Sequence, residues 1–231
     1  MLKLLKLLKL LFFKTPQIRK IPDDIDFLPI ESIKTNDNYD TIPTIDYKNP
    51  PCTKTILIVD DNEYATKVTK KEIEGMILLS DKLNAGDFNL LDKNDRTFIS
   101  TLSNEELVSL NMMHKQKYNI IVVHGELAGF TAIDAINNGL FIDYAFLDII
   151  IGGRNIYLGK SIVLDGIDIA SHLAIFCKEC KYIFYSGCTI THESIEYIKA
   201  NDVLGIDIND CIVHKDNNFN KKKKKILGML V

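Results

Sequence analysis

The sequence predicts a doubly wound α/β fold, in which helices cover both faces of a five-stranded parallel sheet. From Lys54 onward, short runs rich in Ile, Val, Phe and Tyr alternate with segments of helical periodicity. The runs are apolar throughout rather than alternating, as is typical of strands that are buried on both faces of a parallel sheet. Five successive strand–helix units of this kind imply right-handed crossovers between parallel strands.

The predicted elements follow in chain order. The strands are Thr55–Asp60, Asn119–His124, Asp143–Asp148, Tyr182–Ser186 and Cys211–His214. The helices are Asn62–Ser80, Phe130–Asn137, Gly166–Cys180, Glu193–Ala200 and Asn218–Leu230. Residues 81–117 are too many for a simple connection. The capping-box pattern from Ser103 to Glu106 predicts that this inserted segment contains a helix of its own.

The first 53 residues differ from the predicted domain at 54–231. Residues 1–20 are predicted to form a basic amphipathic helix, because Lys3, Lys6 and Lys9 recur among leucines and leave a wide apolar face. Such a helix either lies in a membrane interface through residues 1–14 or docks on this protein or a partner. It is too short and too charged to span a bilayer. Residues 21–53 are polar and interrupted by prolines, which indicates a linker.

Composition narrows the class of protein. The 231 residues carry a net charge of −3, with 46% hydrophobic and 26% charged residues, as in ordinary soluble proteins. This balance does not favour a nucleic-acid partner. The five cysteines form no disulfide framework, and Cys177–Cys180 is a single CxxC without a second pair. Reduced thiols in a cytoplasmic protein are expected, with these cysteines serving in packing rather than in metal or redox chemistry.

Polar residues stand at the ends of four predicted strands. Asp60 and Asp61 end the first, Asp148 the third, Ser186 the fourth and Lys215 follows the fifth. The carboxyl ends of parallel strands share one edge of the sheet, where ligands bind. We therefore expect these five side chains to meet in one pocket. A common alternative for an acidic residue in this position is a helix N-cap, a role open to Asp61.

This set of residue types fits the phosphorylation of a carboxylate. Three neighbouring carboxylates repel one another unless a cation lies among them, and their oxygen ligands suit Mg²⁺. With the metal bound, one carboxylate can attack a phosphoryl group. Lys215 would neutralise charge on the transferred oxygens, and Ser186 would donate a hydrogen bond to one of them.

The same residues resemble those of a known family. From Lys54 to Val231 the chain resembles a response-regulator receiver domain, the phosphoacceptor module of two-component signalling. The matching positions are the acidic pair Asp60 and Asp61, Asp148 in the run LDI, Ser186, Lys215 and the Asp-Gly start of a helix at Asp165-Gly166. The resemblance covers these strand ends well and the helices between them loosely. It implies a flavodoxin-like sheet with strand order 2-1-3-4-5.

The resemblance also implies roles for individual residues. Asp148 would be the phosphorylation site, with Ser186 and Lys215 assisting at the phosphoryl group. Asp61 would be the main carboxylate ligand of Mg²⁺, and Asp60 would bind it through water. Asp148 and the backbone carbonyl of Ile150 would complete the protein's share of the metal shell.

Several features depart from the family pattern, among them the interval of 148 − 61 = 87 positions from Asp61 to Asp148, about twice that of a compact receiver. The loop Ile149–Leu164 is long and glycine-containing where receivers have a short turn. Lys215 is followed by Asp216 instead of proline. Ile212 stands where receivers usually have an aromatic residue that moves inward after phosphorylation. The last departure concerns how the phosphorylated state is read, not the phosphorylation chemistry.

Two other readings remain open at this point. Residues 153–161 resemble a P-loop, although five residues instead of four separate the glycine from Gly159-Lys160, so a nucleotide-binding protein is the weaker alternative. A binding module that keeps the receiver fold but signals without phosphate is the other. The run Lys221–Lys225 looks like a nucleic-acid or membrane patch, but a solvated helix face is the favoured interpretation.

Together these inferences predict a stand-alone receiver. We expect a histidine kinase or phosphotransfer protein to phosphorylate Asp148 and a downstream protein partner to recognise the result. The expected localisation is cytoplasmic, at the inner membrane surface if residues 1–14 bind lipid. Apart from its own phosphorylation and dephosphorylation, no enzymatic activity is expected.

Overall fold

The computed structural model describes residues 53–151, 155–157, 160–162, 164–187, 199–215 and 219–230. The chain divides into two units, Met1–Thr41 and Ile42–Val231, and every described residue belongs to the second. The predicted helix at 1–20 lies outside the described residues, and so do the linker up to residue 52 and residues 193–198 of the fourth predicted helix. Among the helices that the structure does describe, none is both long and apolar enough to cross a bilayer.

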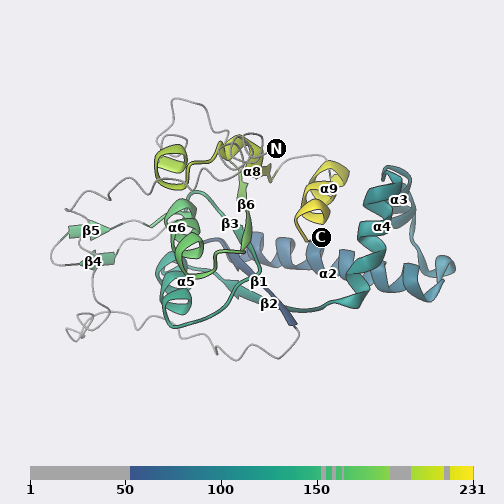
Figure 1. Ribbon diagram of the computed structural model, residues 1–231, viewed down its shortest axis with the longest axis horizontal. Coiled ribbons are helices and arrows are strands. Elements are labelled where there is room, and N and C mark those ends of the chain that lie inside the picture. Colours follow the sequence, from purple (N-terminus) through teal and green to yellow (C-terminus); the bar gives the residue numbers. More distant parts are fainter. Residues whose placement is uncertain are drawn as a thin grey trace, which may run out of the picture. The chain divides into compact units, whose positions relative to one another are not determined.

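The centre of the domain is a five-stranded sheet (Figure 1). Its strands are β1 (Thr53–Val59), β2 (Lys117–Val123), β3 (Tyr144–Leu147), β6 (Lys181–Ser186) and β7 (Ile212–His214). They lie in the order β2-β1-β3-β6-β7, and each neighbouring pair is parallel. Numbered among themselves, the strands have the order 2-1-3-4-5. The predicted flavodoxin-like fold is therefore confirmed.

Helices cover both faces of the sheet (Figure 1). On one face lie α5 (Ala128–Asn137) and α6 (Gly166–Phe176), and on the other lie α2 (Glu63–Ala85) and α9 (Phe219–Leu230). Successive residues of β1 alternate between the two layers. Leu57 and Val59 belong to one core cluster, whereas Ile56 and Ile58 belong to the other. Because both sets are buried, the strand reads as a continuous apolar run.

Helix α2 follows β1 after a short polar turn. Asn62 caps it, because the side-chain oxygen of Asn62 accepts hydrogen bonds from the backbone N–H groups of Tyr64 and Ala65. The helix ends at Gly86, whose φ of 75° lies in the left-handed region that glycine adopts without strain. Its C-terminal end therefore lies five residues beyond the predicted end at Ser80, and residues 81–85 belong to the helix rather than to the insertion.

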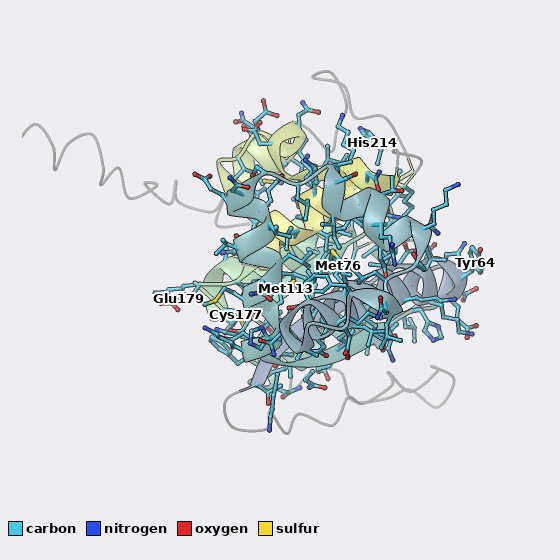
Figure 2. All side chains as sticks on the ribbon, turned by 90° about the vertical axis from the view of Figure 1, so that its right-hand side faces the viewer. Tyr64, Met76, Met113, Cys177, Glu179 and His214 are labelled. Atoms are coloured by element: carbon cyan, nitrogen blue, oxygen red, sulfur yellow. The ribbon has the colours of Figure 1, made fainter. Side chains whose placement is uncertain are left out.

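The inserted segment between α2 and β2 is helical, as predicted. It contains η2 (Phe88–Leu90), α3 (Lys93–Ser100), α4 (Asn104–Met112) and η3 (Met113–Lys115). The capping box at the start of α4 is present, with Ser103 and Glu106 each accepting from the other's backbone N–H. Met113 and Met76 of α2, both labelled in Figure 2, are buried in the same core cluster. The insertion thus extends the hydrophobic layer on the α2 side of the sheet.

The long loop after β3 contains a β-hairpin. Strand β4 (Asn155–Tyr157) pairs antiparallel with β5 (Lys160–Ile162). A P-loop requires the Gly-Lys-Ser residues to open a helix, but Lys160 and Ser161 are in a strand, and α6 begins only at Gly166. The P-loop on which the nucleotide-binding alternative rested is therefore not formed by Lys160 and Ser161. The glycines of this loop, at positions 152, 153 and 159, lie outside the described residues.

Between β6 and β7 the described chain contains η4 (Ala200–Leu204), a turn of π-helix, and the short helix α8 (Ile208–Cys211). Gly205 ends η4 with a φ of 68°. Ala200 and Ile208 are buried in the same core cluster as α5 and α6. These two elements therefore belong to the α6 side of the sheet.

Candidate functional site

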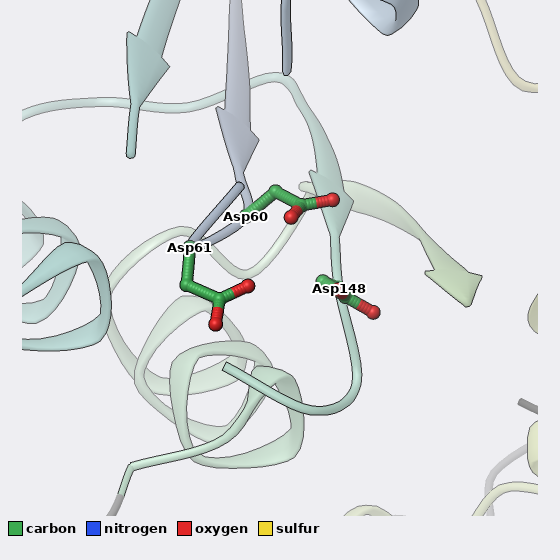
Figure 3. Close-up of side chains that lie close together, drawn as sticks. All are labelled: Asp60, Asp61 and Asp148. Atoms are coloured by element: carbon green, nitrogen blue, oxygen red, sulfur yellow. The ribbon is translucent and has the colours of Figure 1, made fainter. Parts of the chain in front are cut away.

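Three carboxylates gather at the carboxyl ends of two neighbouring strands (Figure 3). Asp60 and Asp61 follow β1, and Asp148 follows β3. The two strands are in register at their last residues, Val59 and Leu147, so the polar residues that come next lie side by side. One oxygen from each of the three side chains lies within 4.8 Å of the others. The predicted convergence of these residues is thus observed.

Lys215 joins this group from β7, at the far end of the sheet order. Its Nζ donates to Asp60 Oδ2 at 2.6 Å and to Asp148 Oδ2 at 2.7 Å. Burial alone would lower the pKa of Lys215, but the hydrogen bonds from its ammonium group to Asp148 and Asp60 outweigh burial and raise it. The lysine is therefore held in its charged form between two strand ends.

The environment of Asp148 disfavours its charge. Its side chain is only 10% exposed, and burial raises the pKa of Asp148 to about 6. The hydrogen bond from Lys215 works against this rise, whereas the negative charge of Asp60 adds to it. A bound cation would favour the ionised form, so the site is electrostatically suited to receive one.

Backbone hydrogen bonds fix the positions of the acidic residues. The N–H of Asp148 donates to Val59 O at 2.8 Å, and the N–H of Asp60 donates to Val123 O at 3.2 Å. Asp60 Oδ1 accepts from the N–H of Asn62 at 2.9 Å. Because Asn62 caps α2, the alternative in which Asp61 is the N-cap is excluded. Three strands therefore hold the site through main-chain contacts.

Gly166 touches the backbone of Asp148. A Cβ atom on Gly166 would lie 2.1 Å from the carbonyl oxygen of Asp148, closer than any real contact allows. The N–H of Gly166 also donates to Ile149 O at 3.1 Å. Only glycine permits this approach. The Asp-Gly pair that the sequence resemblance singled out therefore has a physical role in holding the loop after β3.

Two other predicted site residues are placed in part. Ser186 is the last residue of β6 and lies opposite His214 in the register with β7, but its side chain is not among those described. Ile150 lies two residues after Asp148 and is 50% exposed. Both therefore lie at the same edge of the sheet as the carboxylates, and their roles in binding phosphate and metal stay predictions.

Sequence reasoning missed an ionic cluster beside the site. Lys199 pairs with Asp165 Oδ2 and with Asp168 Oδ1, both at 2.7 Å. Asp165 also caps α6, and its own backbone N–H donates to the carboxylate of Asp168. The capping-box spacing of Asp165 and Asp168 is readable from the sequence. Nothing in the local pattern around Lys199 indicates its partners, which lie more than 30 positions earlier.

The two cysteines of the CxxC sequence, Cys177 and Cys180, lie in surroundings that keep their thiols protonated. Cys177 is buried at the end of α6, and its thiol donates to Leu140 O at 3.6 Å. Burial raises the pKa of the Cys177 thiol and, more strongly, that of Cys180. Raised pKa values favour the thiol over the nucleophilic thiolate. These observations agree with the expected structural role.

The carboxylate group fits Mg²⁺ by its chemistry. Asp60, Asp61 and Asp148 form the one set of at least three metal-ligating side chains that the described part of the chain brings close enough to hold an ion. All their ligand atoms are oxygens, which hard divalent cations prefer, and three carboxylates leave room for the waters that Mg²⁺ retains.

No protein-family model matches the chain, and no curated protein sequence matches it. Among solved structures, the response regulator TrrA of Thermotoga maritima in complex with Mg²⁺ and BeF is similar at 19% identity and a TM-score of 0.42, over 77% of this chain and 99% of that one. TrrA in complex with the histidine kinase ThkA is similar at 18% identity and a TM-score of 0.40, over 78% of this chain and 100% of that one. A CheY-like receiver domain protein of Methanospirillum hungatei is similar at 17% identity and a TM-score of 0.40, over 77% of this chain and 94% of that one. The fold itself rests on the strand order of the chain.

Proposed function

We propose that this protein is a receiver that accepts a phosphoryl group on Asp148 in a Mg²⁺-dependent reaction. The observation that carries the proposal is the position of Lys215, whose ammonium group contacts both Asp60 and Asp148 where three carboxylates meet. A nucleophilic carboxylate, acidic metal ligands and a fixed cation are the parts that phosphoryl transfer to an aspartate requires. The residues reach one point from strands that are far apart in sequence.

Each residue has a defined part in the reaction. An Asp148 carboxylate oxygen attacks phosphorus, the bond from phosphorus to the donor's leaving atom breaks, and the donor departs with that bonding pair. Bound Mg²⁺ would supply charge neutralisation on the phosphoryl oxygens, with Asp60 and Asp61 as its carboxylate ligands. Lys215 supplies a second positive charge from the β7 side. Ser186 would donate a hydrogen bond to a phosphoryl oxygen.

The proposed partners follow from this chemistry. A carboxylate acceptor needs a donor with a labile phosphoryl group, such as the phosphohistidine of a histidine kinase or phosphotransfer protein. A downstream protein partner would then recognise the phosphorylated form, and the proposed localisation is the cytoplasm. A receiver of this kind acts on itself, so we propose a signalling role rather than catalysis on a separate substrate.

Intact-mass spectrometry after incubation with acetyl phosphate tests the proposal. We expect a single phosphate adduct with Mg²⁺ and none with EDTA. Hydroxylamine should remove the adduct, as it does any acyl phosphate. Asp148→Asn should abolish labelling, whereas Asp81→Asn, at an exposed position of α2, should leave it unchanged. An adduct that persists in Asp148→Asn would show that another residue is the acceptor.

A phosphate-independent binding module on the same fold is the second candidate. Two observations favour it: the usual aromatic position before Lys215 holds Ile212, and the loop after β3 contains the β4–β5 hairpin. The same experiment separates the two functions. A folded wild-type protein that binds Mg²⁺ and takes no phosphate from acetyl phosphate or a phosphohistidine donor would support the binding module.

A further inference from the structure

We infer that Lys199 is a positioning residue for the phosphoacceptor, acting through Asp165 and Gly166. The inference rests on the proposed function and adds a residue to the same site. It begins with the two ion pairs of Lys199, to Asp165 and Asp168, each 2.7 Å long. All three side chains are partly buried, between 24% and 29% exposed. Ion pairs shielded to this degree are screened less by water and salt than exposed ones.

The ion pairs fix the first turn of α6. Asp165 Oδ1 accepts from the backbone N–H groups of Ile167 and Asp168, both at 2.9 Å. Its other oxygen, Oδ2, accepts from Lys199. Both oxygens of the Asp165 carboxylate therefore accept hydrogen bonds. Oδ1 caps the N-terminus of α6, and Oδ2 binds Lys199. Removing Lys199 would leave a half-buried carboxylate without its cation.

The first turn of α6 in turn fixes Asp148. Gly166 follows the cap residue directly, and its Cα lies against the carbonyl oxygen of Asp148 so closely that no Cβ could be added. The N–H of Gly166 donates to Ile149 O. A shift of the cap by even a few tenths of an ångström would therefore move the backbone that carries the acceptor carboxylate. Small displacements of a nucleophile slow a reaction steeply.

The path also joins two segments of the chain. Lys199 directly precedes η4, in the connection that leads from β6 to β7. Asp165 lies in the connection that leads from β3 to α6. Lys199 therefore links the segment that follows Ser186 to the segment that follows Asp148.

The test compares two lysines in the full chain. Lys199→Met removes the ammonium group and keeps the length of the side chain. Lys54→Met is the matched control, because Lys54 makes an ion pair of the same 2.7 Å length, with Asp143, at the opposite end of the strands. Each variant is labelled with acetyl phosphate at saturating Mg²⁺, and the initial rate of adduct formation is measured by intact mass. Melting temperatures are recorded in parallel.

We expect Lys199→Met to be labelled about tenfold more slowly than the wild type. Lys54→Met should be labelled at the wild-type rate, even where both variants lose a similar amount of thermal stability. Lys199→Arg, which can pair with both carboxylates, should restore most of the rate. Asp165→Asn keeps a good N-cap but loses the ion pair, so it should be slowed like Lys199→Met.

The outcomes distinguish the inference from the function on which it rests. If the wild type is labelled and Lys199→Met is labelled equally fast, Lys199 is structural only and the inference is wrong. The same follows if Lys54→Met is slowed as much, because general destabilisation would then explain the rate. If the wild type takes no phosphate, the proposed function itself is wrong, and the inference falls with it.

Discussion

Lys222 of α9 and Glu72 of α2 form an ion pair of 2.9 Å across 150 positions of the chain, with side chains only 7% and 12% exposed. The hydroxyl of Tyr185 donates to the other oxygen of Glu72 at 2.8 Å, and Lys222 Nζ lies 4.5 Å from the centre of the Tyr185 ring. This small network holds the last helix against α2 and β6. It also changes the reading of the lysine run in α9.

The run Lys221–Lys225 was predicted to be a solvated helix face, and that prediction is wrong for every lysine but Lys221, which is exposed. Lys222 and Lys223 are buried, and the ammonium group of Lys223 lies 5.0 Å from the centre of the Phe98 ring in α3. Lys224 and Lys225 are half-buried. Lys224 pairs with Glu106 and donates to Thr101 O, and Lys225 donates to Ile212 O. Lys222–Lys225 therefore attach α9 to α2, the insertion and the sheet rather than forming a charged patch for nucleic acid or lipid.

Removing Glu72 should therefore destabilise the protein. We expect Glu72→Leu to lower the free energy of unfolding by about 3 kcal/mol, because it leaves the ammonium group of Lys222 buried and unpaired. The double variant Glu72→Leu/Lys222→Met should recover about 2 kcal/mol of this loss. Urea denaturation measures both values. Additive effects of the two substitutions would show that the pair is not coupled.

Glu74→Leu provides the control on the same helix. Glu74 pairs with Lys70 at 3.7 Å, and both side chains are well exposed. Exposed pairs contribute little to stability, so we expect a change in the free energy of unfolding below about 0.5 kcal/mol. If Glu74→Leu lowers the free energy of unfolding as much as Glu72→Leu does, the location of the residue in α2, and not the burial of its charge, determines the loss of stability.

The contrast between Asp148 and Lys222 shows what the sequence can predict. The strands are local apolar runs, and parallel strands must end at one edge, so the meeting of Asp60, Asp61 and Asp148 follows from periodicity and topology alone. The burial of Lys222 depends on Glu72, which is remote in sequence, and a run of lysines carries no local sign of it. The ion pairs of Lys199 escape prediction for the same reason.

Turns show a similar limit. The end of α2 was placed at Ser80, although the chain continues as a helix until Gly86 provides the left-handed residue that stops it. The hairpin of β4 and β5 was missed because three-residue strands are too short for a period to be recognised. The end of α2 depends on the backbone conformation of Gly86, and the hairpin depends on the pairing of two short strands. Neither feature produces a pattern over many residues.

Gly166→Ala is expected to be costly, unlike Gly75→Ala. At Gly166 the new methyl group would clash with Asp148 O, so the first turn of α6 or the strand end must move. We expect both a lower melting temperature and slower labelling of Asp148. At Gly75, in the exposed middle of α2, the Cβ meets nothing within 4 Å, and the free energy of unfolding should rise by about 0.5–1 kcal/mol. Thermal unfolding and acetyl phosphate labelling of both variants measure these effects. Equal melting temperatures and equal labelling rates in the two variants would contradict the close approach at Gly166.

The neighbours of Asp148 should move its pKa in opposite directions. In metal-free protein we expect the Asp148 carboxyl to titrate near pH 6. Asp60→Asn removes a like charge that raises this pKa, so the pKa should fall. Lys215→Met removes a hydrogen-bond donor that lowers it, so the pKa should rise further. The chemical shift of the Asp148 carboxyl carbon, followed against pH by NMR, reports both changes. A shift in the same direction in the two variants would contradict the ion pairs of Lys215.

The raised pKa of Asp148 also predicts how stability depends on pH and metal. The folded state holds the Asp148 proton up to about pH 6, whereas the unfolded chain releases it near the ordinary value of 3.8. Ionised Asp148 therefore costs stability above pH 6, and this cost disappears as the pH falls below the unfolded value. Asn does not titrate, so in EDTA at pH 7.5 we expect Asp148→Asn to be more stable than the wild type by about 1–3 kcal/mol. The difference should shrink as the pH falls from 7 towards 4. Urea denaturation at several pH values measures it.

Mg²⁺ should reverse this order. A cation that binds the folded wild type adds stability in proportion to the logarithm of its concentration above the dissociation constant. Asp148→Asn lacks one of the three carboxylates and should gain less from the same addition. At saturating Mg²⁺ and pH 7.5 the wild type should therefore become the more stable protein. If Asp148→Asn is already the less stable one in EDTA, the pairing of Asp148 with Lys215 outweighs the cost of burying its charge. The acidic site would then be stable without a metal, and the need for Mg²⁺ would lie only in the transfer of the phosphoryl group.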